Sequence, residues 1–241
     1  MRLVVLTGAG MSAESGVPTF RDALTGLWAR FDPERLATPE AFRRDPDLVW
    51  GWYRWRAAQV QRVQPNAGHA AIAAMERDGI EVDVVTQNVD DLHERAGSTR
   101  VHHLHGHLLQ SRCIDCGATA EPDPIVAPYE GGDEGRHEAP PRCARCSGLF
   151  RPGVVWFGEA LPDDAWSAGI SALERADGVV VVGTSGLVHP AASLPGLARW
   201  RGLHVLEINP QTSALTHDVD EHWAMTASAG LTRLAEELRS A

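Results

Sequence analysis

Lysine is absent from the sequence, and all 22 of its basic residues are arginine. This absence excludes modification of the chain itself at a lysine side chain. Basic residues are also outnumbered, since 32 acidic residues leave a net charge of -10 at pH 7. Because proteins that bind duplex nucleic acid usually carry a basic surface, we expect no nucleic-acid partner.

Long hydrophobic runs are absent as well. No apolar stretch approaches the roughly 18 residues that a membrane-spanning helix needs, so we expect no membrane partner. The apolar stretch from Arg2 to Leu6 is soon followed by Gly8, which leaves it too short for the core of a signal peptide. A length of 241 residues, 44% of them hydrophobic, suits a soluble globular protein with one domain and a small insert. We expect a cytoplasmic location.

Cysteine is scarce, but its four copies form two pairs, Cys113 with Cys116 and Cys143 with Cys146. A gap of two residues lets each pair bind one side of a metal ion, and four thiolates complete a closed, structural zinc site. The alternatives are two disulfides in a secreted protein or a redox Cys-x-x-Cys motif. The shared spacing and the absence of a signal peptide favour zinc. The intervening residues 121–141, rich in Pro, Gly and acidic residues, are predicted to form a long loop that the metal holds together.

Apolar runs rich in Val, Ile and Leu predict four buried strands, at residues 2–6, 82–86, 179–182 and 203–208. Helical patterns lie between or after them, at residues 67–77, 191–200 and 231–238. Strands that alternate with helices predict an α/β fold with a Rossmann-like parallel sheet and helices on both faces.

Two segments interrupt this alternation. Residues 21–65 carry helical patterns and no strand, and residues 108–155 carry the cysteines. We expect residues 1–20, 66–107 and 156–241 to form a nucleotide-binding domain. The two inserts are then predicted to form a smaller domain from a helical insert and a four-cysteine zinc module.

The loop after the first predicted strand contains two glycines, Gly8 and Gly10. Glycines let the backbone approach a phosphate, and the N-terminus of the following helix offers N–H groups to an anion. The spacing alone is a weak indication. The sequence also lacks the second strand and the acidic residue that a dehydrogenase would place after this helix, so a generic dehydrogenase is disfavoured.

Seven motifs follow one another along the chain: Gly8–Arg21, Thr86–His93, His103–Gly106, the two cysteine pairs, Trp156–Glu159, Gly183–Ser185 and Glu207–Asn209. In content and order they resemble the motifs of the sirtuins, the NAD-dependent protein lysine deacylases, over about residues 1 to 230. The bacterial class III branch is the most similar, because Tyr53 and Arg56 stand where that branch has its acyl-reading pair. The resemblance implies NAD as co-substrate, acylated lysine side chains of proteins as partners, and one structural Zn²⁺ per chain.

The resemblance implies three catalytic residues. His105 resembles the neutral base that takes a proton from a ribose hydroxyl, a task that suits imidazole. The alternatives for His105 are a surface histidine or a metal site shared with His103 and His107. Asn88 would position the ribose and a water molecule, and Asp90 would hold the nicotinamide carboxamide. The alternative for both is that they only cap the next helix.

The resemblance also implies a larger set of cofactor-binding residues. In this set, Arg21 would bridge the phosphates and Phe20 would shield the reacting ribose face. Ala227 is included only because of its position in the chain. The full set is Gly8, Ala9, Gly10, Ser12, Ala13, Glu14, Pro18, Thr19, Phe20, Arg21, Trp28, Gln87, Asn88, Val89, Asp90, Gly183, Thr184, Ser185, Asn209, Pro210, Gln211 and Ala227.

Tyr53 and Arg56 lie three residues apart in a helical pattern, so both side chains can point from one face into one pocket. A guanidinium there would pair with an acyl carboxylate and the phenol would add a hydrogen bond, which predicts removal of succinyl and malonyl as well as acetyl groups. By resemblance, Ala37 widens this pocket. The alternative for Arg56 is a solvated helix residue.

A substrate peptide would add as a strand along the segment that resembles the family's peptide-binding segment. The alternative for Trp156 is a residue of the core. The segment consists of Val155, Trp156, Phe157, Gly158 and Glu159.

The motifs leave two other activities open. A protein ADP-ribosyltransferase would transfer the same ribosyl group to another acceptor, and a non-catalytic sensor would only bind NAD or ADP-ribose. A sensor predicts a lost base, whereas His105, Asn88 and Asp90 are all present. The physiological substrates and the oligomeric state, a monomer included, stay open.

Overall fold

A computed structural model describes residues 1–18, 33–130 and 137–240 of the chain. The chain divides into two compact units. The larger unit comprises Met1–Thr19, Gln64–Leu104 and Pro162–Ala241, and the smaller unit comprises Phe20–Val63 and His105–Leu161.

The larger unit is built on a six-stranded parallel sheet in the order β3-β2-β1-β6-β7-β8. Its strands are β1 (Arg2–Thr7), β2 (Glu81–Thr86), β3 (Val101–His103), β6 (Gly178–Val182), β7 (His204–Ile208) and β8 (Glu221–Trp223). From β1 the chain adds β2 and then β3 on one side. It later returns to the other side of β1, where it adds β6, β7 and β8. Ligands of open α/β sheets bind at such a reversal, beyond the carboxyl ends of the strands.

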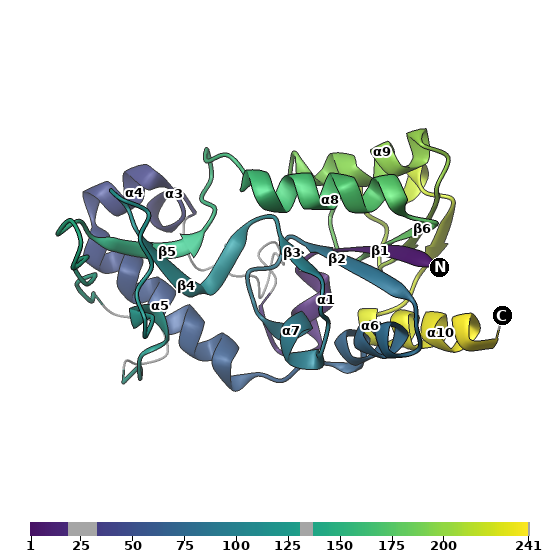
Figure 1. Cartoon of the computed structure of the whole chain (residues 1–241), viewed down its shortest axis with the longest axis horizontal. Coiled ribbons are helices and arrows are strands. Elements are labelled where there is room, and N and C mark those ends of the chain that lie inside the picture. The colour runs from purple at the N-terminus through teal and green to yellow at the C-terminus, as the bar shows by residue number, and fades with distance from the viewer. Residues whose placement is uncertain (19–32, 131–136, 241) are drawn as a thin grey trace. The chain divides into compact units, whose positions relative to one another are not determined.

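Helices cover both faces of this sheet, as predicted (Figure 1). One face is covered by α6 and α10, with α7 packed on α6 and α1 on α10, and the other by α8 and α9. Their bounds are α1 (Gly10–Ala13), α6 (Ala67–Arg77), α7 (Leu92–Ala96), α8 (Asp163–Arg175), α9 (Leu194–Trp200) and α10 (Ala227–Ser240), with the short 3₁₀ turns η2 (Ala191–Ser193) and η3 (Thr216–Asp218). The predicted α/β fold class is confirmed.

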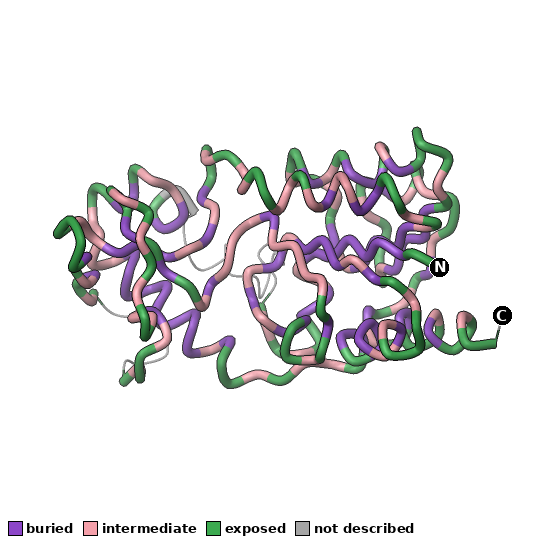
Figure 2. Tube along the Cα trace, viewed as in Figure 1, coloured by how far each residue is buried: buried purple, intermediate pink, exposed green. Residues whose placement is uncertain are grey.

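The main hydrophobic core lies between the sheet and the helices α6 and α10. Val5, Val84 and Val182 point into it from three neighbouring strands, and Ile72 and Leu231 meet them from the helices. Figure 2 shows the central strands buried along most of their length. Because parallel strands are buried on both faces, they have continuous apolar sequences, and this explains why the runs predicted them.

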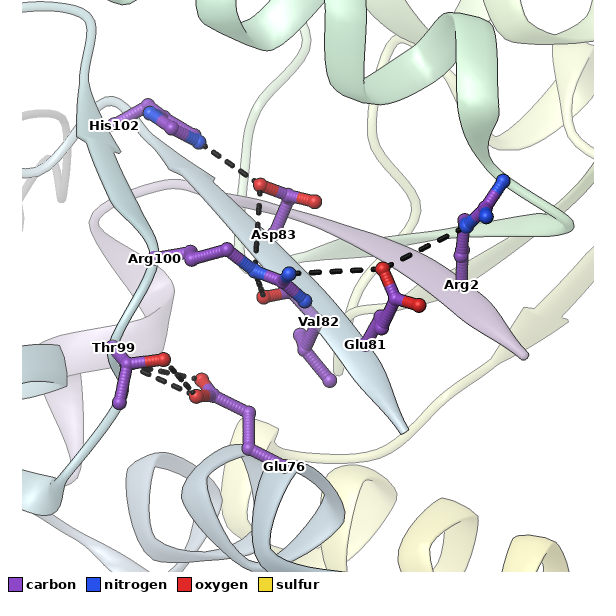
Figure 3. Close-up of polar contacts among 8 residues, drawn as sticks. All are labelled: Arg2, Glu76, Glu81, Val82, Asp83, Thr99, Arg100 and His102. Atoms are coloured by element: carbon purple, nitrogen blue, oxygen red, sulfur yellow. Dashed lines mark hydrogen bonds and ion pairs between the residues drawn. The ribbon is translucent and has the colours of Figure 1, made fainter. Parts of the chain in front are cut away.

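Polar and charged side chains connect the edge strand β3 and the residue before it to β2 (Figure 3). His102 on β3 lies 3.1 Å from a carboxylate oxygen of Asp83 on β2, and Arg100 lies 3.8 Å from the same oxygen. Arg100 also lies 3.7 Å from Glu81, which in turn lies 3.6 Å from Arg2 of β1. Polar contacts thus contribute to holding this three-residue strand, in which Val101 is the single apolar residue, so no apolar run marks it in the sequence.

The smaller unit combines helices with an antiparallel pair of strands. Its elements are α3 (Pro33–Leu36), α4 (Pro39–Arg44), α5 (Pro46–Arg62), β4 (Gly106–Cys113), the 3₁₀ turn η1 (Pro124–Val126) and β5 (Phe150–Val154). The described part of residues 21–65 is helical and contains no strand, as the sequence pattern predicted. Helix α5 packs against β4, β5 and η1.

Helix α5 begins where the Asp45 side chain accepts a hydrogen bond from Leu48 N (3.0 Å), with Pro46 in its first turn. Most of its residues are buried, including Trp50 and Trp55, so it is a core helix of the smaller unit. It has 17 residues. Within the described ranges, no helix is both long enough and apolar enough to cross a membrane.

Arg54 of α5 organises part of the loop between the two cysteine pairs. It is only 5% exposed, and its guanidinium pairs with Glu138 at 3.1 Å. It also donates to the carbonyl oxygens of Pro124, Ile125, Ala127 and Pro128. The prediction that a metal holds this loop together therefore missed a second anchor.

Candidate active site and metal centre

In the larger unit, the glycine-containing loop after β1 lies against the loop after β6. Gly8 N donates to Val182 O (3.0 Å), and Gly10 N donates to Gly183 O (2.8 Å). A Cβ on Gly10 would lie 2.7 Å from the Gly183 Cα, and Gly183 itself has φ +60°. Both positions therefore require glycine. Their contact fixes the loop backbone at the point where the sheet order reverses.

Ser12, Asn88 and Asp90 form a buried polar cluster beside this loop. The Ser12 hydroxyl donates to Asp90 Oδ2 (2.9 Å) and accepts a hydrogen bond from Asn88 Nδ2 (3.2 Å). Burial raises the pKa of Asp90, and the hydrogen bonds from Ser12 and Leu92 only partly oppose this. Asp90 Oδ1 accepts the Leu92 N–H (3.2 Å), so this carboxyl also caps the start of α7. The alternative that Asp90 only caps the next helix therefore accounts for Oδ1, but it does not account for Oδ2, which binds Ser12.

The backbone of Asn88 is held on both sides. Its N–H donates to the Thr86 hydroxyl (2.9 Å), and its carbonyl lies 2.9 Å from His103 Nδ1. The other ring nitrogen of His103 lies 2.7 Å from a Glu94 carboxylate oxygen. Burial acts to lower the pKa of His103, but Glu94, the Asn88 carbonyl and Asp90 outweigh it, so the pKa lies above 6.5. A protonated His103 donates to both Asn88 and Glu94.

Three predicted cofactor residues converge from the ends of β2, β6 and β7. Gln87 Nε2 donates to the Thr184 hydroxyl (3.2 Å), and Asn209 Nδ2 donates to the Thr184 carbonyl (3.0 Å). Ser185 is exposed just beyond Thr184. The carboxyl ends of β2, β6 and β7 thus present polar side chains at one edge of the sheet.

The other predicted cofactor residues are more scattered. Ala227 is the buried first residue of α10, and Glu14 Oε2 accepts the Ser228 N–H (2.9 Å) beside it. Pro210 and Gln211 are exposed after β7. Ala9 and Val89 are half-buried, and Ala13 and Pro18 are exposed. Thr19, Phe20, Arg21 and Trp28 lie outside the described residues.

In the smaller unit, His105 stands at the start of the strand pair. Its carbonyl accepts the Val155 N–H (2.8 Å), and the next residue, Gly106, pairs with Val154. Gly106 has φ +74°, and a Cβ there would collide with the Gly153 carbonyl, so this turn requires glycine. Among the residues that the structure describes, no group of possible metal ligands includes His105, so a metal site to which His105 contributes lacks support.

Arg151 and Glu159 fix the predicted peptide-binding segment. The Glu159 carboxylate binds the Arg151 guanidinium (3.0 Å between Oε2 and Nη2) and accepts the Trp156 N–H (2.8 Å). Burial would raise the pKa of Glu159, but these hydrogen bonds lower it below its ordinary value. Glu159 therefore binds within the smaller unit, while Phe157 is 52% exposed and Gly158 is exposed beside it. Arg151 belongs to none of the sequence motifs, so its role was not predicted.

The predicted acyl-pocket residues lie together in the smaller unit. The Tyr53 hydroxyl accepts the Trp156 Nε1–H (3.1 Å), and the Arg56 guanidinium lies 5.7 Å from the centre of the Tyr53 ring. Ala37 O accepts the Phe157 N–H (2.9 Å). Arg56 is only 8% exposed, so it is not the solvated helix residue of the alternative interpretation.

The four cysteines form one cluster with free thiols. Their sulfur atoms lie within 4.8 Å of one another, with 3.4 Å between Cys113 and Cys146 and 3.8 Å between Cys116 and Cys143. Zn–S bonds of about 2.3 Å in a tetrahedron place the sulfurs about 3.8 Å apart. Disulfide sulfurs lie about 2.05 Å apart, so the disulfide alternative is wrong and the donor set fits zinc.

Comparisons with known proteins agree with this arrangement. The Sir2 family model matches residues 8–190. The chain is 51% identical to the NAD-dependent protein deacylase of Mycobacterium leprae (strain TN). The alignment is 244 residues long and covers 99% of this chain and 98% of the relative. Over 219 residues, 90% of this chain and 86% of the relative, it is 56% identical to NAD-dependent protein deacylase 1 of Pseudomonas aeruginosa. A solved complex of a Sir2 homolog with NAD, 46% identical, matches 99% of this chain and 90% of its own with a TM-score of 0.88.

Proposed function

The chain belongs to the Sir2 family, and from this membership we propose that it is an NAD-dependent protein-lysine deacylase. It would release nicotinamide and O-acyl-ADP-ribose, and it would remove succinyl and malonyl groups as well as acetyl groups. The observation that carries the proposal is the buried Ser12–Asn88–Asp90 cluster at the carboxyl end of β2, beside the fixed glycine loop.

The larger unit holds the residues that would bind NAD. Its glycine loop leaves no room for a Cβ at Gly10, and beside it lie the buried carboxyl of Asp90 and the amide of Asn88. Bound NAD would supply the ribosyl carbon that receives the acyl oxygen, with nicotinamide as the leaving group. Asn88 would orient the ribose and a water molecule through its amide. Asp90 would bind the carboxamide, because each carboxylate oxygen can accept more than one hydrogen bond.

His105 would act as the general base that takes a proton from a ribose hydroxyl. An imidazole suits this task because its unperturbed pKa lies near neutral pH. The hydrogen bond from Val155 and the obligatory turn at Gly106 hold the backbone of this residue in the smaller unit. The four cysteines would hold zinc in a structural role, since four thiolates leave no coordination position open for substrate.

The buried Arg56 and Tyr53 support the acidic part of the proposed acyl range. The Arg56 guanidinium is 8% exposed and lies 5.7 Å from the centre of the Tyr53 ring, so one acyl carboxylate could contact both side chains. A succinyl or malonyl carboxylate would bind the guanidinium and accept a hydrogen bond from the phenol, whereas an acetyl group offers neither interaction. Phe157 and Gly158, exposed next to the fixed Trp156, would pair with the peptide backbone.

The proposed function is tested by incubating the protein with NAD and succinyl-lysine or acetyl-lysine peptides. We expect nicotinamide, deacylated peptide and O-acyl-ADP-ribose in equal amounts, measured by mass spectrometry. His105→Ala should reduce turnover about 10²–10⁴-fold while NAD binding stays within a few-fold of wild type. ADP-ribose attached to protein would indicate an ADP-ribosyltransferase instead, and NAD binding with no nicotinamide release would indicate a sensor.

A further inference from the structure

The indole of Trp156 and the phenol of Tyr53 are joined by a buried hydrogen bond. Trp156 Nε1 donates to the Tyr53 hydroxyl oxygen over 3.1 Å, although the residues are 103 positions apart in the chain. Trp156 is 1% exposed and Tyr53 is 3% exposed. The bond lies wholly within the smaller unit, among the residues proposed to form the acyl pocket.

The direction of this bond determines what the phenol can still do. An indole N–H only donates, whereas a tyrosine hydroxyl both donates and accepts. Because Trp156 fills an acceptor position of the oxygen, the hydroxyl hydrogen must point elsewhere. Within the described ranges, no second partner for the Tyr53 hydroxyl is present. Burial raises the pKa of Tyr53, so the hydroxyl keeps its hydrogen at neutral pH.

Both rings are held independently of any substrate. The Arg151 guanidinium carbon lies 3.4 Å from the centre of the Trp156 ring, and Glu159 binds the Trp156 backbone N–H. The Tyr53 ring meets the ring of Trp52 edge-on, with 4.7 Å between centroids. The indole N–H is thus preorganised, and the bond should exist before substrate binds.

We propose that Trp156 is a positioning residue for acyl specificity, because its N–H directs the Tyr53 hydroxyl hydrogen toward the carboxylate of an acidic acyl group. This inference rests on the proposed function. Arg56, which lies 5.7 Å from the Tyr53 ring centre, would supply the positive charge, and Tyr53 would supply a hydrogen bond of fixed direction. A succinyl carboxylate uses that donor, whereas an acetyl group leaves it unpaired in a buried site.

A purely structural role for Trp156 makes a different prediction. Loss of packing would lower the activity on both substrates by similar factors, together with the melting temperature. If Trp156 instead positions the Tyr53 hydroxyl, loss of the indole N–H would mainly lower kcat/KM for the succinyl peptide. The ratio of kcat/KM for succinyl and acetyl peptides therefore separates the two roles.

The experiment compares wild type, Trp156→Phe, Tyr53→Phe and the double variant on both peptides. We expect Trp156→Phe to lower the succinyl-to-acetyl ratio about tenfold, the effect of one hydrogen bond to a charged group. In the Tyr53→Phe background the same change should alter the ratio less than twofold, because no hydroxyl remains to be directed. Trp50→Phe is the matched control, since Trp50 is fully buried in the same unit, and its ratio should equal that of wild type.

Replacement of Trp156 by 3-benzothienylalanine keeps the ring shape and exchanges the N–H for sulfur, which provides a variant if Trp156→Phe does not fold. An unchanged ratio in both variants, or an equal loss with and without the Tyr53 hydroxyl, overturns the inference. Arg56→Met separates this outcome from failure of the proposed function. If Arg56→Met has the same ratio as wild type, the acidic acyl range fails and this inference fails with it. If Arg56→Met lowers the succinyl-to-acetyl ratio and the Trp156 variants do not, the acidic acyl range stands and only the role proposed for Trp156 is wrong.

Discussion

His103 Nδ1 and the backbone carbonyl of Asn88 lie 2.9 Å apart in the larger unit. Glu94 holds the opposite ring nitrogen, so a carboxylate and a carbonyl share one imidazole. The ion pair thereby links a partly exposed acid on α7 to the loop that carries the proposed catalytic residues Asn88 and Asp90.

Glu94→Gln should destabilise the protein in a pH-dependent way. The pKa of His103 is raised in the folded state, so its stabilising effect is fully present below about pH 6.5 and is lost as pH rises through the folded pKa. Because Glu94 is 40% exposed, solvent screening limits the loss at low pH to about 0.5 kcal/mol.

Urea unfolding of wild type and Glu94→Gln at pH 5.5, 7.0 and 8.5 measures this difference. Glu237→Gln is the control, since Glu237 pairs with an arginine, Arg233, and not with a histidine. A Glu94→Gln difference that is constant from pH 5.5 to 8.5 would contradict the role assigned to His103.

Arg54→Met should lower the free energy of unfolding by about 2–4 kcal/mol, because four loop carbonyls and Glu138 lose their shared donor. Thermal unfolding measures the effect, and zinc content measured on the same samples shows whether the loop also supports the cysteine cluster. Arg43→Met is the matched control, because Arg43 makes an exposed pair with Glu40 and should change stability by less than about 0.5 kcal/mol. Equal effects of the two changes would mean that Arg54 does not anchor the loop.

Cys143→Ala should remove zinc and lower the melting temperature by roughly 10 °C before it alters the chemistry. Zinc content by atomic absorption, calorimetry and turnover well below the transition provide the three readouts. Asp115→Asn serves as the control, since Asp115 lies between the first two cysteines but is not a member of the thiol cluster. A zinc-free variant that is as stable and as active as wild type would contradict the structural role of zinc.

The sheet could be predicted where burial is continuous in the sequence. The apolar runs correctly located β1, β2, β6 and β7. The edge strands β3 and β8 were not predicted, because each has three residues and includes histidine. Distant charged partners such as Arg100 and Asp83 fasten β3, and residue periodicity does not reveal such pairs.

The internal partners of the site were harder to predict than its motifs. The motifs named Ser12, Asn88 and Asp90, but the spacing does not reveal that one hydroxyl joins the other two side chains. Arg54 and Arg151 resemble any other arginine in the sequence. Their acceptors are mostly backbone carbonyls, which every residue possesses, so only the fold shows which ones they bind.

Ser12→Ala should disable the proposed cofactor site while leaving the fold intact. The change removes the donor to Asp90 Oδ2 and the acceptor of Asn88 Nδ2, and both atoms belong to buried residues. Unpaired buried groups cost about 1–3 kcal/mol, so we expect kcat/KM for NAD to fall about 10- to 100-fold. The pKa of Asp90 should rise further, because the bond from Ser12 is the largest of the interactions that lower it against the effect of burial.

The matched control for this change is Ser98→Ala. Ser98 is also buried in the larger unit, but its hydroxyl has no hydrogen-bond partner among the described residues, so its loss should leave kcat/KM for NAD within twofold of wild type. Steady-state kinetics with NAD varied at saturating acyl peptide measures both variants, and calorimetry reports their stability. If Ser12→Ala retains wild-type kcat/KM while Asp90→Asn does not, Asp90 acts without the Ser12 hydroxyl. The three-residue cluster would then be a packing arrangement and not a catalytic unit.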